Sequence, residues 1–488
     1  MLLKKLQRQL LGRLMNKNFD LPKNIFLIGI GGIHMSAIAK LLLQRGHNIV
    51  GTDTSQTKII EHLKSIGMKI YSNHEEKNVQ GAELVIFSSA IDKHNPEIVF
   101  AQKNEIPLMS RAQILNSLCD EKDMVAISGS HGKTTISSLL SFILLQAKHE
   151  PLIMTGGLSK DISQAINTEK GSRFYRDEEN MYDGSGKIAI IEADEYKEAF
   201  LSYFPMHILI NNIDADHLDY FGSKNAIINS FNDFANSLHE SGTLFINKDS
   251  IEANEIGLKN NQKKIEYYSI EKRTDWQAKK ITGNKNDTTS FEVYWKGSKL
   301  GIITTNLIGR HNVTNIIGCV AVAMKLGIGF QQIQSAIQQF QGIDRRFSIY
   351  KHPNDVVVVD DYAHHPTEIK ATIAATKTKF PGYKIITCFQ PHTFSRTQYL
   401  LEEFKHSFEH VNQLIIVPTF AARETEDQGI NSKNLHEEIS LKNCILAPSI
   451  EFATKKITEN ITSKTVILVL GAGDISKLIP KINKILSR

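Results

Sequence analysis

The sequence predicts an α/β protein with three domains, because of its length, its alternating elements and its two glycine turns. A chain of 488 residues is too long for a single hydrophobic core. Apolar strands alternate with amphipathic helices, which is typical of parallel sheets covered by helices. We expect a Rossmann-like N-terminal domain (residues 1–122), a central domain with a parallel or mixed sheet (123–342) and a Rossmann-like C-terminal domain (343–488).

Composition and charge predict a globular protein of the cytoplasm. Hydrophobic residues make up 41% of the chain and charged residues 22%, which is ordinary for globular proteins. The net charge is +5, but residues 1–20 alone carry +4, so the nearly neutral remainder argues against a nucleic acid partner. For residues 1–20 we expect a basic helical extension packed on its own domain rather than a membrane-surface helix. No apolar run reaches transmembrane length, and the four widely spaced cysteines predict reduced thiols.

The central domain begins with a strand that runs into a candidate phosphate loop. Residues 125–135 read Val-Ala-Ile-Ser-Gly-Ser-His-Gly-Lys-Thr-Thr. The two glycines would let backbone N–H groups converge on phosphate oxygens, Lys133 would supply a charge, and the Thr134 hydroxyl would bind Mg²⁺. Ile127 stands where the common pattern has its first glycine, so an ordinary strand-to-helix turn is the alternative. The flanking strand and helix favour an ATP site in a domain of the P-loop ATPase type.

A second glycine turn follows an apolar segment near the N-terminus. Gly31 and Gly32 could bring backbone donors close to a diphosphate, and a helix opens near Ser36. Asp53, at the end of the next strand, could accept a hydrogen bond from a ribose hydroxyl. His34 stands at the third glycine of a G-x-G-x-x-G pattern. The turn therefore predicts a diphosphate site better than a dinucleotide site, and a purely packing role for the glycines is the alternative.

Acidic residues follow two apolar segments downstream of the phosphate loop. The two clusters are Glu192-Ala-Asp194-Glu195 and Asp214-Ala-Asp216-His217. Acids at the carboxyl ends of parallel strands, next to a phosphate loop, predict a metal site and the place of the attacking group. Helix capping is the alternative for some of them. The polar segment 169–187 between the loop and these clusters predicts an exposed loop.

Taken together, the motifs resemble the Mur ligases of bacterial peptidoglycan synthesis. The resemblance runs from Ile28 to Ile475 and keeps the order of the motifs. Further motifs are Gly-Arg-His-Asn-Val-Thr-Asn from 309, Asp-Arg-Arg-Phe from 344, Asp-Asp-Tyr-Ala-His-His-Pro-Thr-Glu from 360 and Phe-Gln-Pro-His-Thr-Phe-Ser-Arg-Thr from 389. The resemblance implies an ATP- and Mg²⁺-dependent ligase that joins L-alanine to the carboxylate of UDP-N-acetylmuramate through an acyl phosphate. A related recycling ligase that attaches a tripeptide to the same nucleotide sugar is the alternative, and we expect a monomer or weak dimer.

The resemblance also implies roles for individual residues. ATP would be bound by Gly129, Ser130, His131, Gly132, Lys133, Thr134, Thr135, His311, Asn315, Arg345, Arg346 and Asp361. Two Mg²⁺ ions would be held by Thr134, Glu192 and His217, and the UDP-sugar by Gly31, Gly32, Ser36, Asp53 and Ser89. The amino acid would be bound by Tyr362, His364, His392 and Arg396, and catalysis would involve Lys133, His364, His392 and Arg396. One of the two histidines is the candidate base, and a hydrogen-bonding role in the pocket wall is the alternative.

Three departures from the family pattern leave other interpretations open. Thr393 stands where many relatives have a second arginine. Tyr196-Lys197 stands where many alanine-adding relatives have Ser-Asp, which favours the tripeptide alternative, whereas the motifs from 360 and 389 favour the single amino acid. His34 replaces a glycine in the first turn. A regulator with a decayed active site is disfavoured because Lys133, Thr134 and the metal-site residues are all present. The interpretation of the chain as an NAD-dependent oxidoreductase is supported only by the first glycine turn, whose pattern is interrupted by His34.

Overall fold

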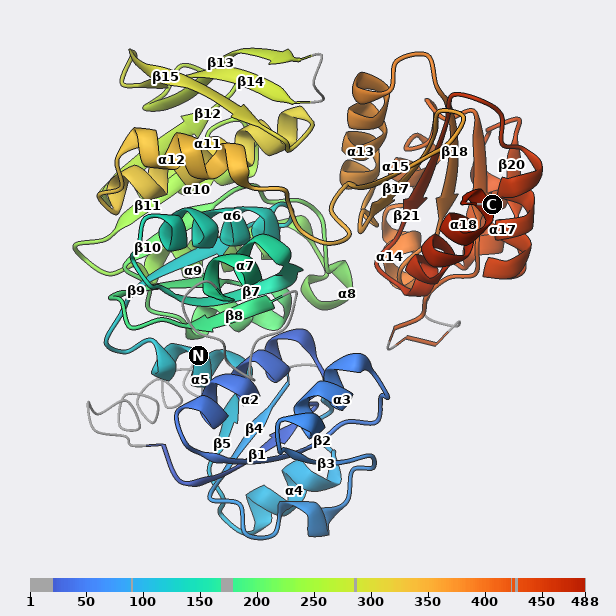
Figure 1. The fold of residues 1–488 in the computed structure, drawn as a ribbon. Helices are drawn as coiled ribbons and strands as arrows, with labels where there is room; N and C mark the ends of the chain where they lie inside the picture. Colours follow the sequence, from blue (N-terminus) through green and yellow to red (C-terminus); the bar gives the residue numbers. More distant parts are fainter. Residues whose placement is uncertain are drawn as a thin grey trace.

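The protein consists of three consecutive α/β units, each built on its own sheet (Figure 1). The structure is a computed structural model that describes residues 21–88, 91–167, 179–284, 288–422, 424–425 and 429–487. The predicted fold class is confirmed. The predictions for residues 1–20 and for Ser89 lie outside the described residues.

The N-terminal unit has a five-stranded parallel sheet in the order β3-β2-β1-β4-β5, which is a Rossmann arrangement. Its strands are β1 (Asn24–Ile28), β2 (Asn48–Thr52), β3 (Lys69–Tyr71), β4 (Leu84–Phe87) and β5 (Leu108–Ser110). Its helices are α2 (Ile33–Gln44), α3 (Lys58–Ser65), the 3₁₀ turn η1 (Glu76–Val79), α4 (Pro96–Lys103) and α5 (Arg111–Leu118). The first strand is apolar throughout its buried length because it lies mid-sheet with helices on both faces.

The central unit has a ten-stranded sheet in the order β15-β14-β13-β12-β11-β10-β6-β9-β7-β8. Its strands are β6 (Asp123–Ser128), β7 (Leu152–Ser159), β8 (Glu179–Asp183), β9 (Ile188–Glu192), β10 (His207–Ile210), β11 (Thr243–Asn247), β12 (Ile265–Ser269), β13 (Trp276–Gly283), β14 (Thr289–Trp295) and β15 (Ser298–Thr305). Its helices are α6 (Lys133–Gln146), α7 (Lys160–Asn167), the 3₁₀ segment η2 (Tyr196–Ser202), α8 (Leu218–Phe221), α9 (Lys224–Asn236), α10 (Ile251–Lys259), α11 (Arg310–Lys325) and α12 (Phe330–Gln339). The strand that precedes the phosphate loop pairs in parallel with β9 and β10, so both acidic clusters emerge beside that loop.

The prediction of an exposed loop over residues 169–187 is wrong for its second half. β8 pairs antiparallel with β7, and its first four residues are buried. Glu179 is buried because Lys40 of the N-terminal unit lies 2.5 Å away and neutralises it. Polar composition therefore did not mean exposure, since a charged partner compensates for the lost solvent.

The C-terminal unit has a six-stranded sheet in the order β16-β17-β21-β18-β19-β20, parallel except for β16. Its strands are β16 (Ser348–His352), β17 (Val356–Asp361), β18 (Lys384–Phe389), β19 (Gln413–Ile416), β20 (Cys444–Leu446) and β21 (Thr465–Leu470). Its helices are α13 (Pro366–Lys379), α14 (Phe394–Tyr399), α15 (Leu401–Lys405), α16 (Ser432–Glu438), α17 (Ile450–Glu459), the 3₁₀ turn η4 (Asp474–Lys477) and α18 (Leu478–Leu486).

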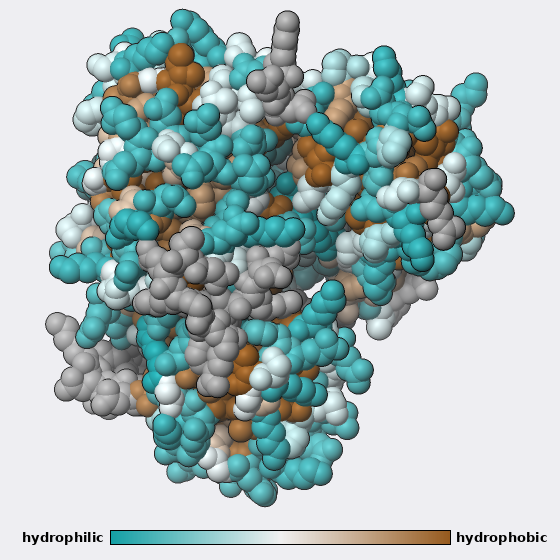
Figure 2. Space-filling model, viewed as in Figure 1, coloured by the Kyte–Doolittle hydropathy of each residue, from teal (hydrophilic) through white to brown (hydrophobic). Residues whose placement is uncertain are grey.

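The C-terminal unit stands beside the central unit, with α14 packed on α8 (Figure 1). By contrast, one hydrophobic core runs from the N-terminal sheet into the central sheet. The face shown in Figure 2 is mainly hydrophilic, with small scattered apolar groups. Among the described helices, none combines the length and hydropathy that crossing a bilayer requires.

Candidate active site

The loop between β6 and α6 has a backbone that suits phosphate binding. Gly129 has φ of +139° and Gly132 has φ of +86°, a region that side chains other than glycine rarely adopt. A Cβ atom at Gly132 would lie 2.7 Å from side-chain atoms of both Asn211 and Asn315. The helix begins at Lys133, so the positive end of its dipole faces the loop.

Lys133 is held within its own loop by an acidic partner. Its ammonium donates hydrogen bonds to the Gly129 carbonyl at 2.5 Å and to the Glu195 carboxylate at 2.8 and 3.0 Å. Burial opposes the charge, but Glu195 and Asp194 raise the pKa of Lys133, so the side chain is a cation. An incoming phosphate would therefore compete with Glu195 for this ammonium.

Thr134 and Glu192 come together beside the loop as oxygen donors. The Thr134 hydroxyl donates to Glu192 at 3.0 Å, and the N–H of Gly156 on β7 donates to the other carboxylate oxygen at 2.7 Å. A Cβ atom at Gly156 would lie 2.6 Å from Glu192, and one at Gly157 would lie 2.7 Å from Thr134. Sequence reasoning missed these glycines, although two adjacent glycines inside a strand signal a close approach. The oxygen donors fit the preference of Mg²⁺.

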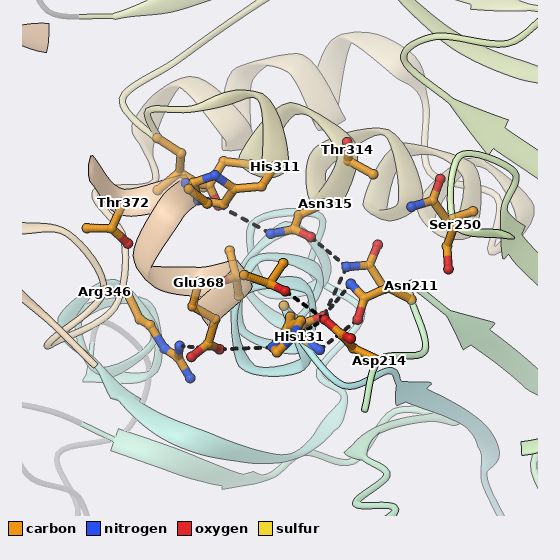
Figure 3. A pocket seen from close by; sticks show the side chains of 18 of the residues that line it. His131, Asn211, Asp214, Ser250, His311, Thr314, Asn315, Arg346, Glu368 and Thr372 are labelled. Atoms are coloured by element: carbon orange, nitrogen blue, oxygen red, sulfur yellow. Dashed lines mark hydrogen bonds and ion pairs between the residues drawn. The ribbon is translucent and has the colours of Figure 1, made fainter. Parts of the chain in front are cut away.

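A cavity of about 440 Å³ opens between the phosphate loop and α13 (Figure 3). Its lining includes these residues predicted to bind ATP: His131, Gly132, Thr135, His311, Asn315, Arg346 and Asp361. Burial lowers the pKa of His311 to about 4, so its ring is neutral and suited to stacking on a base. Burial raises the pKa of Asp361 to about 7, and its carboxylate accepts the Ala363 N–H at 2.8 Å.

An asparagine network forms the wall of this cavity opposite α13. The side-chain oxygen of Asn315 accepts from Asn211 at 2.9 Å, and its amide nitrogen donates to Asn312 at 3.2 Å. The Tyr268 hydroxyl donates to Asn211 at 2.8 Å. These bonds fix the orientation of Asn315. Sequence reasoning did not assign Asn211. Its signal was its position directly after β10, the strand that leads into the acidic cluster that begins at Asp214.

The two neighbouring arginines point to different places. Arg346 lines the cavity, whereas Arg345 donates to the Gly471 carbonyl at 2.6 Å and lies 3.8 Å from Asp360. Both guanidinium groups lie about 5 Å from the centre of the Tyr362 ring. The structure therefore brings only Arg346 to the nucleotide cavity. Arg345 helps to hold the C-terminal unit together.

A second cavity, of about 940 Å³, is lined by all three units. Asp92 comes from the N-terminal unit, Asp216 and His217 from the central unit, and His392 and Arg396 from the C-terminal unit. These lining residues place His217 and part of the predicted amino-acid site around one space. They also show that all three units contribute side chains to this space, although the predicted UDP-sugar residues Gly31, Gly32, Ser36 and Asp53 do not line it.

Arg396 already has a carboxylate partner in the second cavity. Its guanidinium donates to one oxygen of Asp216 at 2.7 and 3.1 Å, and both side chains are 9% exposed. Tyr362 and His364 lie behind this pair, with the His364 ring 5.4 Å from that of His392. Thr393, at the position of a second arginine in relatives, also lines this cavity but adds no charge to it.

The two candidate bases differ in which ring nitrogen is available. His364 Nδ1 lies 3.0 Å from the Tyr362 carbonyl, so Nδ1 carries the hydrogen and Nε2 keeps its lone pair. His392 Nδ1 lies 2.9 Å from Arg396 Nη1, so its lone pair is already used by a donor. Burial lowers the pKa of His364 to about 4 and that of His392 to about 2. Of the two, His364 has the lone pair available for a proton.

The donors predicted to bind a diphosphate in the N-terminal unit are occupied within the turn. The Gly31 N–H donates to Asp53 at 2.8 Å, and the Gly32 N–H donates to the Gly29 carbonyl at 3.3 Å. Ser36 is 5% exposed and donates to the Ile33 carbonyl. A diphosphate at this turn would have to displace Asp53 from Gly31.

Three sequence profiles of the Mur ligase family match the chain in order. They are described as "Mur ligase family, catalytic domain" over residues 24–123, "Mur ligase middle domain" over 127–323 and "Mur ligase, glutamate ligase domain" over 345–473. The chain belongs to the Mur ligase family. Membership of a ligase family favours an enzyme over a decayed regulator or an oxidoreductase.

This Mur ligase is similar to several named relatives and to several solved structures. The UDP-N-acetylmuramate--L-alanine ligase of Clostridium acetobutylicum is 38% identical over 94% of this chain and 97% of its own. The protein of that name from Clostridium tetani is 37% identical over 93% and 96%. The crystal structure of the UDP-N-acetylmuramate-alanine ligase from Thermotoga maritima has a TM-score of 0.77 at 23% identity, covering 94% of this chain and 98% of that one. A murein peptide ligase from Psychrobacter arcticus has a TM-score of 0.70 at 22% identity, covering 96% and 99%. At these identities the two structures show the fold alone.

One further residue that sequence reasoning missed links two units of this Mur ligase. Arg111, at the start of α5, lies 3.1 Å from His34 Nδ1 and donates to Asp194 of the central unit at 3.0 Å. His34 therefore faces the central unit from the position of the missing glycine. Burial lowers its pKa to about 4, with Arg111 acting in the same direction. No sequence signal marked Arg111, since its partners are 77 and 83 residues away.

Proposed function

We propose that this Mur ligase joins L-alanine to the carboxylate of UDP-N-acetylmuramate, with ATP converted to ADP and phosphate, in cytoplasmic peptidoglycan synthesis. The observation that carries the proposal is the short segment after β10, because Asp214 lines the first cavity and Asp216 lines the second. A nucleotide and an amino acid would thus approach the same strand end from two sides. The relatives named UDP-N-acetylmuramate--L-alanine ligase, which are 37 to 38% identical over more than nine-tenths of the chain, support this substrate pair.

In the first step the muramate carboxylate oxygen attacks the γ-phosphorus of ATP. A new O–P bond forms as the bond to the β-phosphate oxygen breaks, which gives an acyl phosphate and ADP. Lys133, released from Glu195, and Arg346 at the cavity wall would neutralise the phosphate oxygens. Thr134 and Glu192, with His217 at the second cavity, would hold two Mg²⁺ ions, which when bound would supply further positive charge for the phosphates.

In the second step the amine of L-alanine attacks the acyl carbon, and the tetrahedral species collapses to an amide and phosphate. Arg396 would bind the alanine carboxylate in place of Asp216. His364 is the base that this geometry favours, because its Nε2 lone pair is available to take the ammonium proton. His392 would orient Arg396 through the bond between them.

Closure of the C-terminal unit would bring the two cavities together around the substrates. The connection between α12 and β16 contains Gly342 with φ of +116°, a conformation suited to a hinge. Asp161 accepts the N–H groups of Gln341 and Gly342 at 2.7 and 3.3 Å, which anchors the start of this connection. The Asp344 N–H also donates to the Leu158 carbonyl of β7 at 3.3 Å, so rotation would occur after Asp344.

The proposal is tested by phosphate release with UDP-N-acetylmuramate, ATP and Mg²⁺ present and the amino acceptor varied. We expect release with L-alanine, and little release without it. A panel with glycine, L-serine and the L-alanyl-γ-D-glutamyl-meso-diaminopimelate tripeptide, run in parallel, separates the alanine ligase from the recycling ligase. Release that is indifferent to L-alanine, or that occurs only with the tripeptide, would contradict the proposal.

A further inference from the structure

Glu368, on the first turn of α13, lines the first cavity and is linked to the second through His364, whose ring packs against His392. One carboxylate oxygen lies 3.2 Å from Nδ1 of His131 in the phosphate loop and 3.9 Å from the Arg346 guanidinium. Figure 3 shows these three side chains converging at the wall of the nucleotide cavity. The carboxylate thus connects the C-terminal unit directly to the loop that would bind phosphate.

The other oxygen of Glu368 faces the amino-acid side. It accepts the backbone N–H of His364 at 3.1 Å and that of His365 at 3.3 Å, and it lies 3.4 Å from the His364 ring. His364 packs in turn against His392, which lines the second cavity. A change in the position of Glu368 would therefore move the candidate base and the wall behind Arg396.

His131 completes a bridge between the central and C-terminal units. Its Nε2 lies 3.2 Å from Asp214, which also accepts the Thr367 hydroxyl at 2.7 Å. Burial opposes its charged form, but the hydrogen bonds to Asp214 and Glu368 raise its pKa to about 9. An imidazolium donates from both nitrogens, so His131 would bind one carboxylate on each unit at neutral pH.

We propose that Glu368 is a positioning residue that assembles the nucleotide and amino-acid sites together, by holding His131, Arg346 and His364 on one carboxylate. Both side chains of the His131–Glu368 pair are 14% exposed, so the contact is shielded from solvent. A residue that supported only one site would not contact partners of both. The inference rests on the proposed function for the identity of the two substrates.

The first test is Glu368→Gln, which keeps the size of the side chain and the acceptor that caps α13 but removes the charge. We expect KM for ATP and KM for L-alanine to rise together, each by roughly tenfold, with KM for UDP-N-acetylmuramate little changed. Glu402→Gln is the matched control, because Glu402 is 77% exposed, pairs with Lys405 at 2.8 Å and lines neither cavity. A rise in only one of the two KM values, or none, would overturn the proposal.

The pH dependence of KM for ATP distinguishes the bridge from a purely structural role, which would leave that dependence unchanged. The charged and titratable groups around His131 are Asp214 after β10, Glu368 on α13, His365 at the N-cap of that helix, and Arg346 and His311 beside Glu368. In the unsubstituted protein, KM for ATP should rise as pH passes about 9 and His131 loses its proton. In Glu368→Gln that rise should occur at lower pH, and an unmoved pH profile would count against the bridge.

A double-mutant cycle tests the contact by binding, so it also serves if a folded variant has lost its turnover. His131→Gln, Glu368→Gln and the double variant are compared by the Kd of a nonhydrolysable ATP analogue. The losses should be less than additive, because each substitution breaks the same bridge. Additive losses would overturn the inference. If the unsubstituted protein shows no ligase activity the proposed function fails, while this cycle still decides whether Glu368 acts on the nucleotide site.

Discussion

The two glycine turns of this chain look alike in sequence but differ in what their backbones can bind. Each follows a buried parallel strand and leads into a helix, and each contains a histidine. The N-terminal turn uses the N–H groups of Gly31 and Gly32 internally. The central turn places Gly132 at the wall of a cavity, with Lys133 bound to loop carbonyls and to Glu195, an acid that phosphate could replace.

The difference lies in the neighbouring strands rather than in the glycines. β6 is flanked by β9 and β10, whose ends deliver Glu192, Glu195 and Asp214 around the central turn. β1 is flanked by β2, and Asp53 at the end of that strand closes back on Gly31. The central turn also uses two N–H groups internally, because Asn212 accepts those of Ser130 and His131. The two turns therefore differ chiefly in the lysine and the acids that the adjacent strand ends gather around the central one.

The largest expected effect is from Lys133→Ala in the central turn. Removing this charge from the γ-phosphate should cost about 3 kcal/mol or more of transition-state stabilisation, which is roughly a hundredfold in kcat. Phosphate release under saturating substrates measures it. Lys259→Ala, at the exposed end of α10, is the control. Full activity of Lys133→Ala would mean that the central turn is no more a phosphate site than the N-terminal one.

The histidines of the two turns should respond to pH in opposite ways. His131 has its pKa raised to about 9, so its contribution to stability is complete below pH 6.5 and is lost as pH rises through about 9. We expect a loss on the order of 2 kcal/mol, seen in denaturant unfolding between pH 7 and 10 and absent in His131→Gln. His34 has its pKa lowered to about 4, so its contribution is complete above pH 6.5 and falls as pH drops toward 4. Histidine resonances that titrate together near pH 6.5 would contradict both assignments.

Gly132→Ala should impair the central turn through strain and contact. The left-handed φ of +86° costs about 1–2 kcal/mol for alanine, and the new methyl group would meet Asn211 and Asn315. KM for ATP should rise by roughly tenfold, with a lower unfolding temperature. An unchanged KM for ATP in a folded Gly132→Ala protein would show that the nucleotide does not approach this turn.

The smallest expected effect is from Gly32→Ala in the N-terminal turn. Gly32 has an ordinary φ of −66°, and a Cβ atom there would meet nothing closer than 3.5 Å. Stability should change by less than about 0.5 kcal/mol. If the diphosphate of the sugar nucleotide approaches this turn, KM for UDP-N-acetylmuramate should rise a few-fold while KM for ATP stays the same. Unchanged KM values would place the diphosphate elsewhere.

Much of the fold and part of the site were predictable because they depend on residues close together in sequence. The strand, glycine turn and helix over 125–146 follow from local apolar patterning and glycine conformation. It was not predictable that Arg346 would line the first cavity while Arg345 binds the Gly471 carbonyl within the C-terminal unit. Adjacent residues diverge there because Arg345 has a left-handed backbone with φ of +58°, and its partner Gly471 lies 126 residues away.

The amino-acid order by itself determined the α/β class, the phosphate turn and the motifs that indicate a Mur ligase, since these depend on short-range pattern and backbone preference. Only the tertiary structure decided which charges meet. Asp216 pairs with Arg396 across 180 residues, and His131 pairs with Glu368 across 237. Such pairs depend on strand order and on how the C-terminal unit docks against the phosphate loop, and Coulomb attraction acts only once that docking has brought the groups within a few ångströms.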